Sequence, residues 1–164
     1  MPFELPDDLH PDCAPVAWLL GTWHGNGHGD YPTIEPFDFE QECIFTHDGR
    51  PFLHYMSRAW IVDQNGDRLR DAAIETGFLR PQADGTLEWL LTHNTGFAEI
   101  WHGTAEGAKV EVTTDAVART RSAKEYVAGH RLYGLVETDL LYAFDMAAMG
   151  QELQPHLWGR LVRR

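Results

Sequence analysis

The sequence predicts an all-β protein: an up-and-down antiparallel barrel of about ten strands that follows a short N-terminal helical turn. Three observations support this fold. After Leu20 the chain divides into short apolar segments at regular spacing, turn signals separate these segments, and no stretch has the periodicity of a helix. An open sheet edge invites aggregation, so such a meander is expected to close, and a closed barrel of about ten strands has room for one ligand.

Residues 1–20 are predicted to be an N-terminal arm with a short helix, and residues 21–164 a single barrel domain. The arm is rich in proline and leads into one helical turn at residues 16–20. It lacks a basic start followed by an apolar stretch, and no segment is long and apolar enough to span a membrane. A cytoplasmic protein with two free thiols, Cys13 and Cys43, is therefore expected.

The first predicted strand contains GTWHGNG at residues 21–27, with glycines at alternate positions. Alternate glycines allow a sharp bend or a close backbone approach, so we interpret this segment as a barrel corner packed by Trp23. His24 and His28 share a face of the strand, as metal ligands sometimes do. No further ligands accompany them at metal-site spacing, which favours solvent-facing histidines.

The second strand shows the clearest alternation. FDFEQECIFT, residues 37–46, places apolar and acidic side chains on opposite faces, as a half-buried strand does: Phe37, Phe39, Cys43 and Phe45 against Asp38, Glu40 and Glu42. Further strands are predicted at residues 52–63, 69–80, 86–93, 96–103, 109–115, 123–134, 137–146 and 154–162. Turn signals separate them, of which Asn65-Gly66 is the strongest.

Charge and motifs exclude several functions. The net charge of −12, from 13 basic and 25 acidic residues, argues against nucleic acid or an anionic membrane as a partner. G-x-S-x-G, C-x-x-C, P-loop and dinucleotide-binding motifs do not occur. Basic residues concentrate in ARTRSAK, residues 118–124, where they are either solvated or meet an acidic ligand at the barrel rim.

The last strand raises the question of a histidine inside an apolar run. His156 follows Pro155, which lacks an N–H and suits a strand end, and by alternation Gln154 and Trp158 would flank it on the same face. From residues alone it is either a packed core histidine or a ligand of something that the barrel carries. The expected inward apolar set is Phe37, Phe39, Phe78, Leu91, Leu140, Tyr142 and Phe144.

Four segments, GTWHGNG, GDYPTI, ETGFLRPQADGTLEWLL and LQPHL, together resemble the nitrobindins, small haem-binding proteins with a lipocalin-like barrel. The resemblance runs from about residue 19 to the end of the chain. It implies one haem b per chain with His156 as the proximal iron ligand, Thr33 at the haem, Lys124 near a propionate and Met146 lining the pocket. It also implies a peroxynitrite isomerase, in which ferric iron converts peroxynitrite to nitrate and binds nitric oxide, protecting against reactive nitrogen species.

One position departs from the family pattern. A pocket histidine that some relatives place before the E-[ST]-G-[YF] segment is replaced here by Ala73, which predicts an apolar distal side without a hydrogen-bond donor from that strand. The alternative function is a lipocalin-like carrier of a fatty acid or another apolar small molecule, without iron chemistry. Exposed aromatic residues such as Trp60 or Trp101 could support a homodimer.

Overall fold

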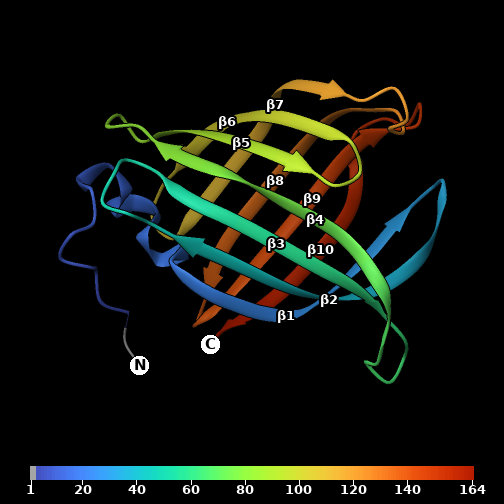
Figure 1. Ribbon diagram of the computed structural model, residues 1–164, viewed down its shortest axis with the longest axis horizontal. Helices are drawn as coiled ribbons and strands as arrows, with labels where there is room; N and C mark the ends of the chain where they lie inside the picture. Colours follow the sequence, from blue (N-terminus) through green and yellow to red (C-terminus); the bar gives the residue numbers. More distant parts are fainter. Residues whose placement is uncertain (1–2) are drawn as a thin grey trace.

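A computed structural model describes residues 3–164, and this part of the chain contains one helix and ten strands. The strands form a closed antiparallel barrel in which sequence neighbours pair and β1 also pairs with β10 (Figure 1). The elements are η1 (Pro11–Leu19), β1 (Gly21–Tyr31), β2 (Ile34–Thr46), β3 (Leu53–Val62), β4 (Arg68–Pro81), β5 (Thr86–His93), β6 (Phe97–Ala105), β7 (Lys109–Arg119), β8 (Tyr126–Val136), β9 (Asp139–Ala148) and β10 (Gln154–Arg163).

The structure confirms the predicted fold class and moves some boundaries. The helix begins at Pro11, earlier than predicted, and is a 3-10 helix, which suits a segment with a second proline inside it at Pro15. Strand β7 continues to Arg119, and β8 begins only at Tyr126, so Lys124 lies in the loop between them. No helix in residues 3–164 has the length and apolarity needed to cross a membrane.

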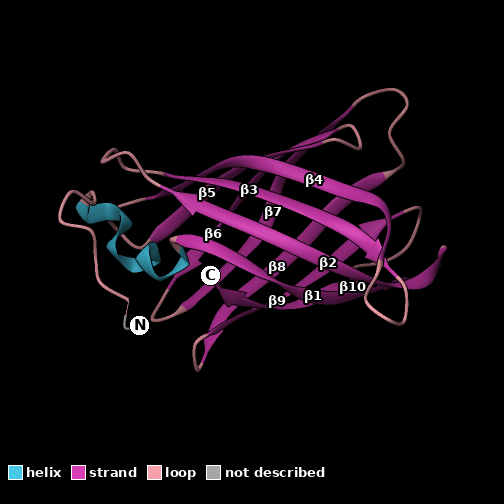
Figure 2. Ribbon diagram, turned by 60° about the horizontal axis from the view of Figure 1, so that its bottom comes forward, coloured by secondary structure: helices cyan, strands magenta, loops and turns pink. Residues whose placement is uncertain are grey.

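The helix covers the end of the barrel at which β1 begins and β10 ends (Figures 1 and 2). Trp23 of β1 is completely buried, and its indole Nε1 donates to the Leu19 carbonyl at 2.8 Å. From β10, the Arg163 guanidinium donates to the Trp18 carbonyl at 2.8 Å and lies over the Trp23 ring. Trp23 and Arg163 therefore attach the helix to β1 and β10. The turns after β1, β3, β5, β7 and β9 form the opposite end of the barrel.

Two aromatic rings of β2 pack directly against glycines of β1. Gly27 pairs with Phe39 and Gly29 with Phe37 in the antiparallel register. A Cβ on Gly27 would overlap both the Phe39 ring and the Trp158 carbonyl oxygen, and one on Gly29 would overlap the Phe37 ring. The glycines are thus required because rings and backbone occupy the space where a side chain would be.

A buried ion pair crosses the barrel interior between β4 and β8, which are not neighbouring strands. Both terminal nitrogens of Arg131 donate to the Glu75 carboxylate, at 2.7 and 2.9 Å, and the Tyr55 hydroxyl donates to it at 2.7 Å. Burial raises the pKa of Glu75, but the Arg131 charge and hydrogen bonds, together with His93 and Tyr55, outweigh it and bring the pKa to about 2. Glu75 is therefore ionised in the native barrel.

Two residues lie elsewhere than the sequence predicts. Phe78, expected to face inward, is 45% exposed and packs against Phe52 on the outer surface, because its neighbour Leu79 takes the inward position. Trp101, expected to be exposed, is completely buried, so it cannot contribute to a dimer contact. Trp60 is half-buried beneath the Arg68 guanidinium, and homodimerisation stays a prediction.

Replacing Gly27 by alanine should destabilise the barrel by about 1–3 kcal/mol, because the added methyl group has no space beside the Phe39 ring and the Trp158 carbonyl. Urea unfolding of the variant measures this. Gly134→Ala is the matched control, because a Cβ there meets nothing closer than a carbonyl oxygen at 3.9 Å. Equal losses in both variants would contradict the steric explanation.

Acid should weaken the barrel through Glu75. Its pKa lies below the unfolded value of 4.5, so its stabilising contribution is complete above that pH and is lost as pH falls toward about 2. The shift corresponds to about 3 kcal/mol of unfolding free energy. Urea titrations from pH 6 down to about 2.5 should show this loss in the wild type and a shallower one in Glu75→Met/Arg131→Met, which removes both charges. Parallel pH profiles would contradict the assignment.

Candidate functional site

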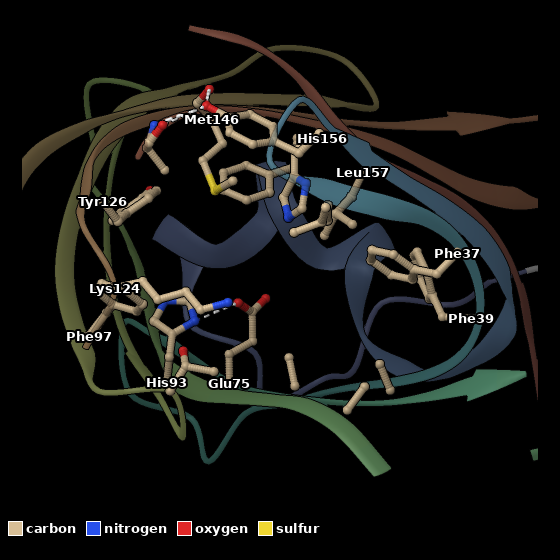
Figure 3. Close-up of a pocket in the computed structure, with 18 of the residues that line it drawn as sticks. Phe37, Phe39, Glu75, His93, Phe97, Lys124, Tyr126, Met146, His156 and Leu157 are labelled. Carbon is tan, nitrogen blue, oxygen red and sulfur yellow. Dashed lines mark hydrogen bonds and ion pairs between the residues drawn. The ribbon is translucent and has the colours of Figure 1, made fainter. Parts of the chain in front are cut away.

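A large cavity opens inside the barrel at the end opposite the helix (Figure 3). Its volume is about 1070 Å³, slightly above the range of about 300–1,000 Å³ that is usual for small-molecule sites. Its lining combines aromatic, aliphatic and charged side chains from the strands and from the open-end loops. The barrel is therefore hollow enough for one large, flat ligand.

His156 reaches this cavity because β10 contains a bulge. Pro155 pairs with Asp145 and Leu157 with Phe144, so His156 has no partner residue on β9. Proline cannot donate to the ladder, and a bulge re-aims the side chain next to it. Figure 3 shows the His156 ring pointing into the cavity, and Leu157 lines it as well.

The His156 ring is fixed in one orientation. Its Nδ1 donates to the Asp30 carbonyl at 3.2 Å; a carbonyl can only accept, so Nδ1 carries the proton and the Nε2 lone pair is free. The rings of Tyr31 and Phe144 hold the imidazole edge-on, at centroid distances of 5.4 and 5.7 Å. Burial lowers the pKa of His156 below its usual value, although the bond to Asp30 opposes this effect. The neutral imidazole is the form that binds metals.

The bulge also corrects a prediction about the neighbours of His156. Gln154 and Trp158 were expected to flank it by simple alternation, but neither lines the cavity. Trp158 is 57% exposed and packs near His28 on the outer surface. Strict alternation fails because the extra residue of the bulge shifts the facing of every residue on one side of it.

Phenylalanine rings line one part of the cavity and alanine side chains another. Phe37 and Phe39, seated on the β1 glycines, form the aromatic wall. A register shift between β3 and β4 places Ala72 and Ala73 opposite Ala59, and all three alanines line the cavity. Within the predicted apolar set, Tyr142 and Phe144 also line it, whereas Leu91 and Leu140 are buried in the core outside it.

The structure brings the other predicted site residues to the same cavity. Thr33 lies in the β1–β2 turn and Lys124 in the β7–β8 loop, both exposed, and Met146 lies on β9 on the same side as His156. Of the three basic residues in the 118–124 segment, Lys124 lines the cavity and Arg119 and Arg121 do not. Their roles toward a ligand stay predictions.

Polar residues that the sequence did not reveal line the side of the cavity opposite His156 (Figure 3). His93 of β5 lies between two carboxylates: its Nδ1 is 3.3 Å from Glu75, and its Nε2 is 2.6 Å from the completely buried carboxylate of Glu99. Ala73 lines the cavity with a methyl group, whereas Glu75, two residues further along β4, adds an ionised carboxylate that accepts hydrogen bonds and donates none. An apolar distal side without a donor from this strand stays a prediction. The sequence signal for the two carboxylates was an acidic residue on the inward face of a strand, Glu75 on β4 and Glu99 on β6.

The two histidines of β1 lie away from the cavity. His24 Nε2 is 2.6 Å from Glu40, and His28 Nδ1 is 2.8 Å from Asp38, both on neighbouring β2. Within residues 3–164, no group of three or more histidine, cysteine, aspartate or glutamate side chains is arranged to hold a metal ion. Both histidines hydrogen-bond to carboxylates of β2 outside the cavity, His28 partly exposed and His24 largely buried beside Glu40.

The cavity residues fit a haem. A neutral, oriented imidazole can supply one axial ligand, and the alanine and phenylalanine walls offer apolar surfaces for a flat macrocycle. Lys124 at the open end can pair with an acidic substituent.

Comparisons with known proteins agree with this geometry. Residues 12–163 match the family model described as THAP4-like, heme-binding beta-barrel domain. A protein of Nocardioides sp. named Peroxynitrite isomerase is 71% identical over 164 residues, covering both chains completely, and a Ferric nitrobindin-like protein of Cutibacterium acnes is 44% identical over 99% of each chain. The crystal structure of Rv2717c from M. tuberculosis superimposes with a TM-score of 0.86 at 37% identity, covering 95% of this chain and 99% of that one.

The family match covers nearly all of the described barrel, and its heme-binding description suits a cavity with an inward histidine. The chain belongs to the family of THAP4-like, heme-binding β-barrel domains.

Proposed function

We propose that this protein binds one ferric haem b per chain, isomerises peroxynitrite to nitrate and binds nitric oxide. The observation that carries the proposal is His156, a neutral imidazole with its Nε2 free, at the wall of a cavity of about 1070 Å³. The relative named Peroxynitrite isomerase, identical at 71% of positions, supports the activity.

Each predicted site residue has a role in this proposal. His156 would hold the iron, Met146 on β9 and Thr33 in the β1–β2 turn would line the haem site, and Lys124 at the open end would pair with a propionate. A haem bound there would supply a ferric iron that can act as a Lewis acid on peroxynitrite.

The chain itself orients the ligand and shields the site. The Asp30 carbonyl fixes the proton on Nδ1 of His156, which keeps Nε2 available and makes the imidazole more basic toward a metal. Tyr31 and Phe144 restrict rotation of the His156 ring. Phe37 and Phe39 present an apolar surface that disfavours water in the cavity.

Hemin titration tests the cofactor. Purified protein should take up one equivalent of hemin with a Soret band, and His156→Ala should weaken uptake by more than about tenfold, because the iron loses its axial ligand. Added imidazole should restore the Soret band in the variant by filling the vacated position. His102→Ala, which removes an exposed histidine on the outside of β6, is the matched control. A flat titration, or equal uptake by wild type and His156→Ala, would refute haem ligation by His156.

Peroxynitrite decay tests the activity. Ferric protein should hasten the decay, shift the products toward nitrate and protect free tyrosine from nitration, and apoprotein should do none of this because the Lewis-acid iron is missing. Stopped-flow absorbance measures the rate, and nitrate and nitrotyrosine are measured by chromatography. Equal protection by the apoprotein would show that iron is not the agent.

A further inference from the structure

The guanidinium of Arg131 lies at the cavity wall in the geometry of a carboxylate-binding site. Arg131 is 5% exposed and lines the cavity, and its fork meets both oxygens of a carboxylate. This bidentate arrangement, with an added bond from the Tyr55 hydroxyl, is the way in which proteins bind carboxylate ligands. Here the carboxylate belongs to Glu75 of the same chain.

We propose that Glu75 is a specificity-determining residue, because it fills this carboxylate site and prevents a carboxylate-bearing ligand from placing its acid group at the inner wall. The three donated bonds occupy both terminal nitrogens of Arg131 and the Tyr55 hydroxyl and, within the described residues, leave only the buried Nε of Arg131 without a partner. A ligand could take the site only by displacing a paired and buried internal carboxylate, which would then lack a counter-charge.

A second internal carboxylate reinforces the exclusion. The Glu99 side chain is 1% exposed and lines the cavity, with His93 between it and Glu75. An incoming acid group at this wall would therefore face the carboxyl groups of Glu75 and Glu99 and no unpaired guanidinium.

Cations stand free at the open end instead. Lys124 in the β7–β8 loop and Arg70 near the start of β4 are exposed and line the cavity. Neither has an ion-pair partner within residues 3–164. Acidic residues line the same end, namely Glu35, Asp71 and Glu125. An acid group can still pair with Lys124 or Arg70 there, whereas the buried guanidinium is already paired, so a carboxylate-bearing ligand is expected to enter with its acid end outward.

The expected orientation, with the acid group at the open end and not at Arg131, applies to any carboxylate-bearing ligand of the barrel. For haem it directs the propionates to the open end, and in this respect it rests on the proposed function. It also disfavours the alternative of a fatty-acid carrier that holds the acid group at a buried cation, because the buried guanidinium is already paired.

Chemical rescue of Glu75→Ala tests the proposal on apoprotein, without haem. Removing the side chain opens space beside Arg131 and leaves its charge unpaired, so acetate or formate should bind there. The melting temperature of the variant should fall below that of the wild type and rise saturably with acetate, by about 3–5 °C for each tenfold increase above Kd. Wild-type protein should not respond beyond the effect of chloride at equal ionic strength, and acetamide should have no effect on either protein.

Two controls separate site binding from general salt effects. Glu75→Ala/Arg131→Met keeps the space without the cation, and Glu75→Gln keeps the volume without an opening; neither should be stabilised by acetate. The proposal is overturned if acetate acts no better than chloride on Glu75→Ala, or acts equally on the double variant. It is also overturned if Glu75→Ala stays unfolded in acetate while the double variant folds. Because no haem is added, hemin titration of the wild type judges the proposed cofactor separately.

Discussion

Strand β1 pairs with β2 on one side and with β10 on the other, and the site depends on this double pairing. The register places Gly29 between Phe37 and Leu157, so closing the barrel also seats the aromatic wall beside the end of β10. The next residue, Asp30, presents its carbonyl to His156. A slip of one residue would turn the glycine face outward and remove both the ring seats and the acceptor.

Several buried polar groups of the barrel interior bond to one another. Beyond the Glu75–Arg131 pair, the Tyr142 hydroxyl donates to Gln41, whose amide donates to Ser57 at 2.8 Å. Buried ion pairs seldom stabilise more than apolar residues of similar volume would, so stability alone is a weak reason for this arrangement. A role in ligand orientation gives the pair a reason to be at the cavity wall.

Local patterns made the barrel predictable, and long-range contacts made much of the site unpredictable. The alternation of residues 37–46 identified β2 and the inward positions of Phe37 and Phe39 without any tertiary information. His156 was found through its motif, whereas its acceptor at Asp30 lies 126 residues away, and a backbone carbonyl leaves no mark in a sequence. Alternation misplaced Trp158 because Pro155 marks a strand irregularity without specifying which residue bulges.

The acidic residues show the same limit in a different form. Glu75 and Glu99 read as ordinary polar positions, and their burial follows from Arg131 and His93, which arrive from β8 and β5. Glu75, His93 and Glu99 lie on the neighbouring strands β4, β5 and β6, and Glu75 is directly opposite His93 in the register. Arg131 comes from across the barrel, so no local pattern in the sequence relates it to Glu75.

The basic residues of the cavity differ in whether they are paired: in the part of the chain that the structure describes, the buried one is paired, and those at the entrance are not. The protein carries a net charge of −12, which opposes the approach of any anion, including peroxynitrite and the propionate-bearing haem. Inside, the one buried guanidinium of the cavity lining in residues 3–164 is neutralised by Glu75, while Lys124 and Arg70 remain available at the entrance. An acid group can therefore pair with a cation only at the entrance, where the propionates of a bound haem would lie, because the guanidinium deeper in the barrel is already paired.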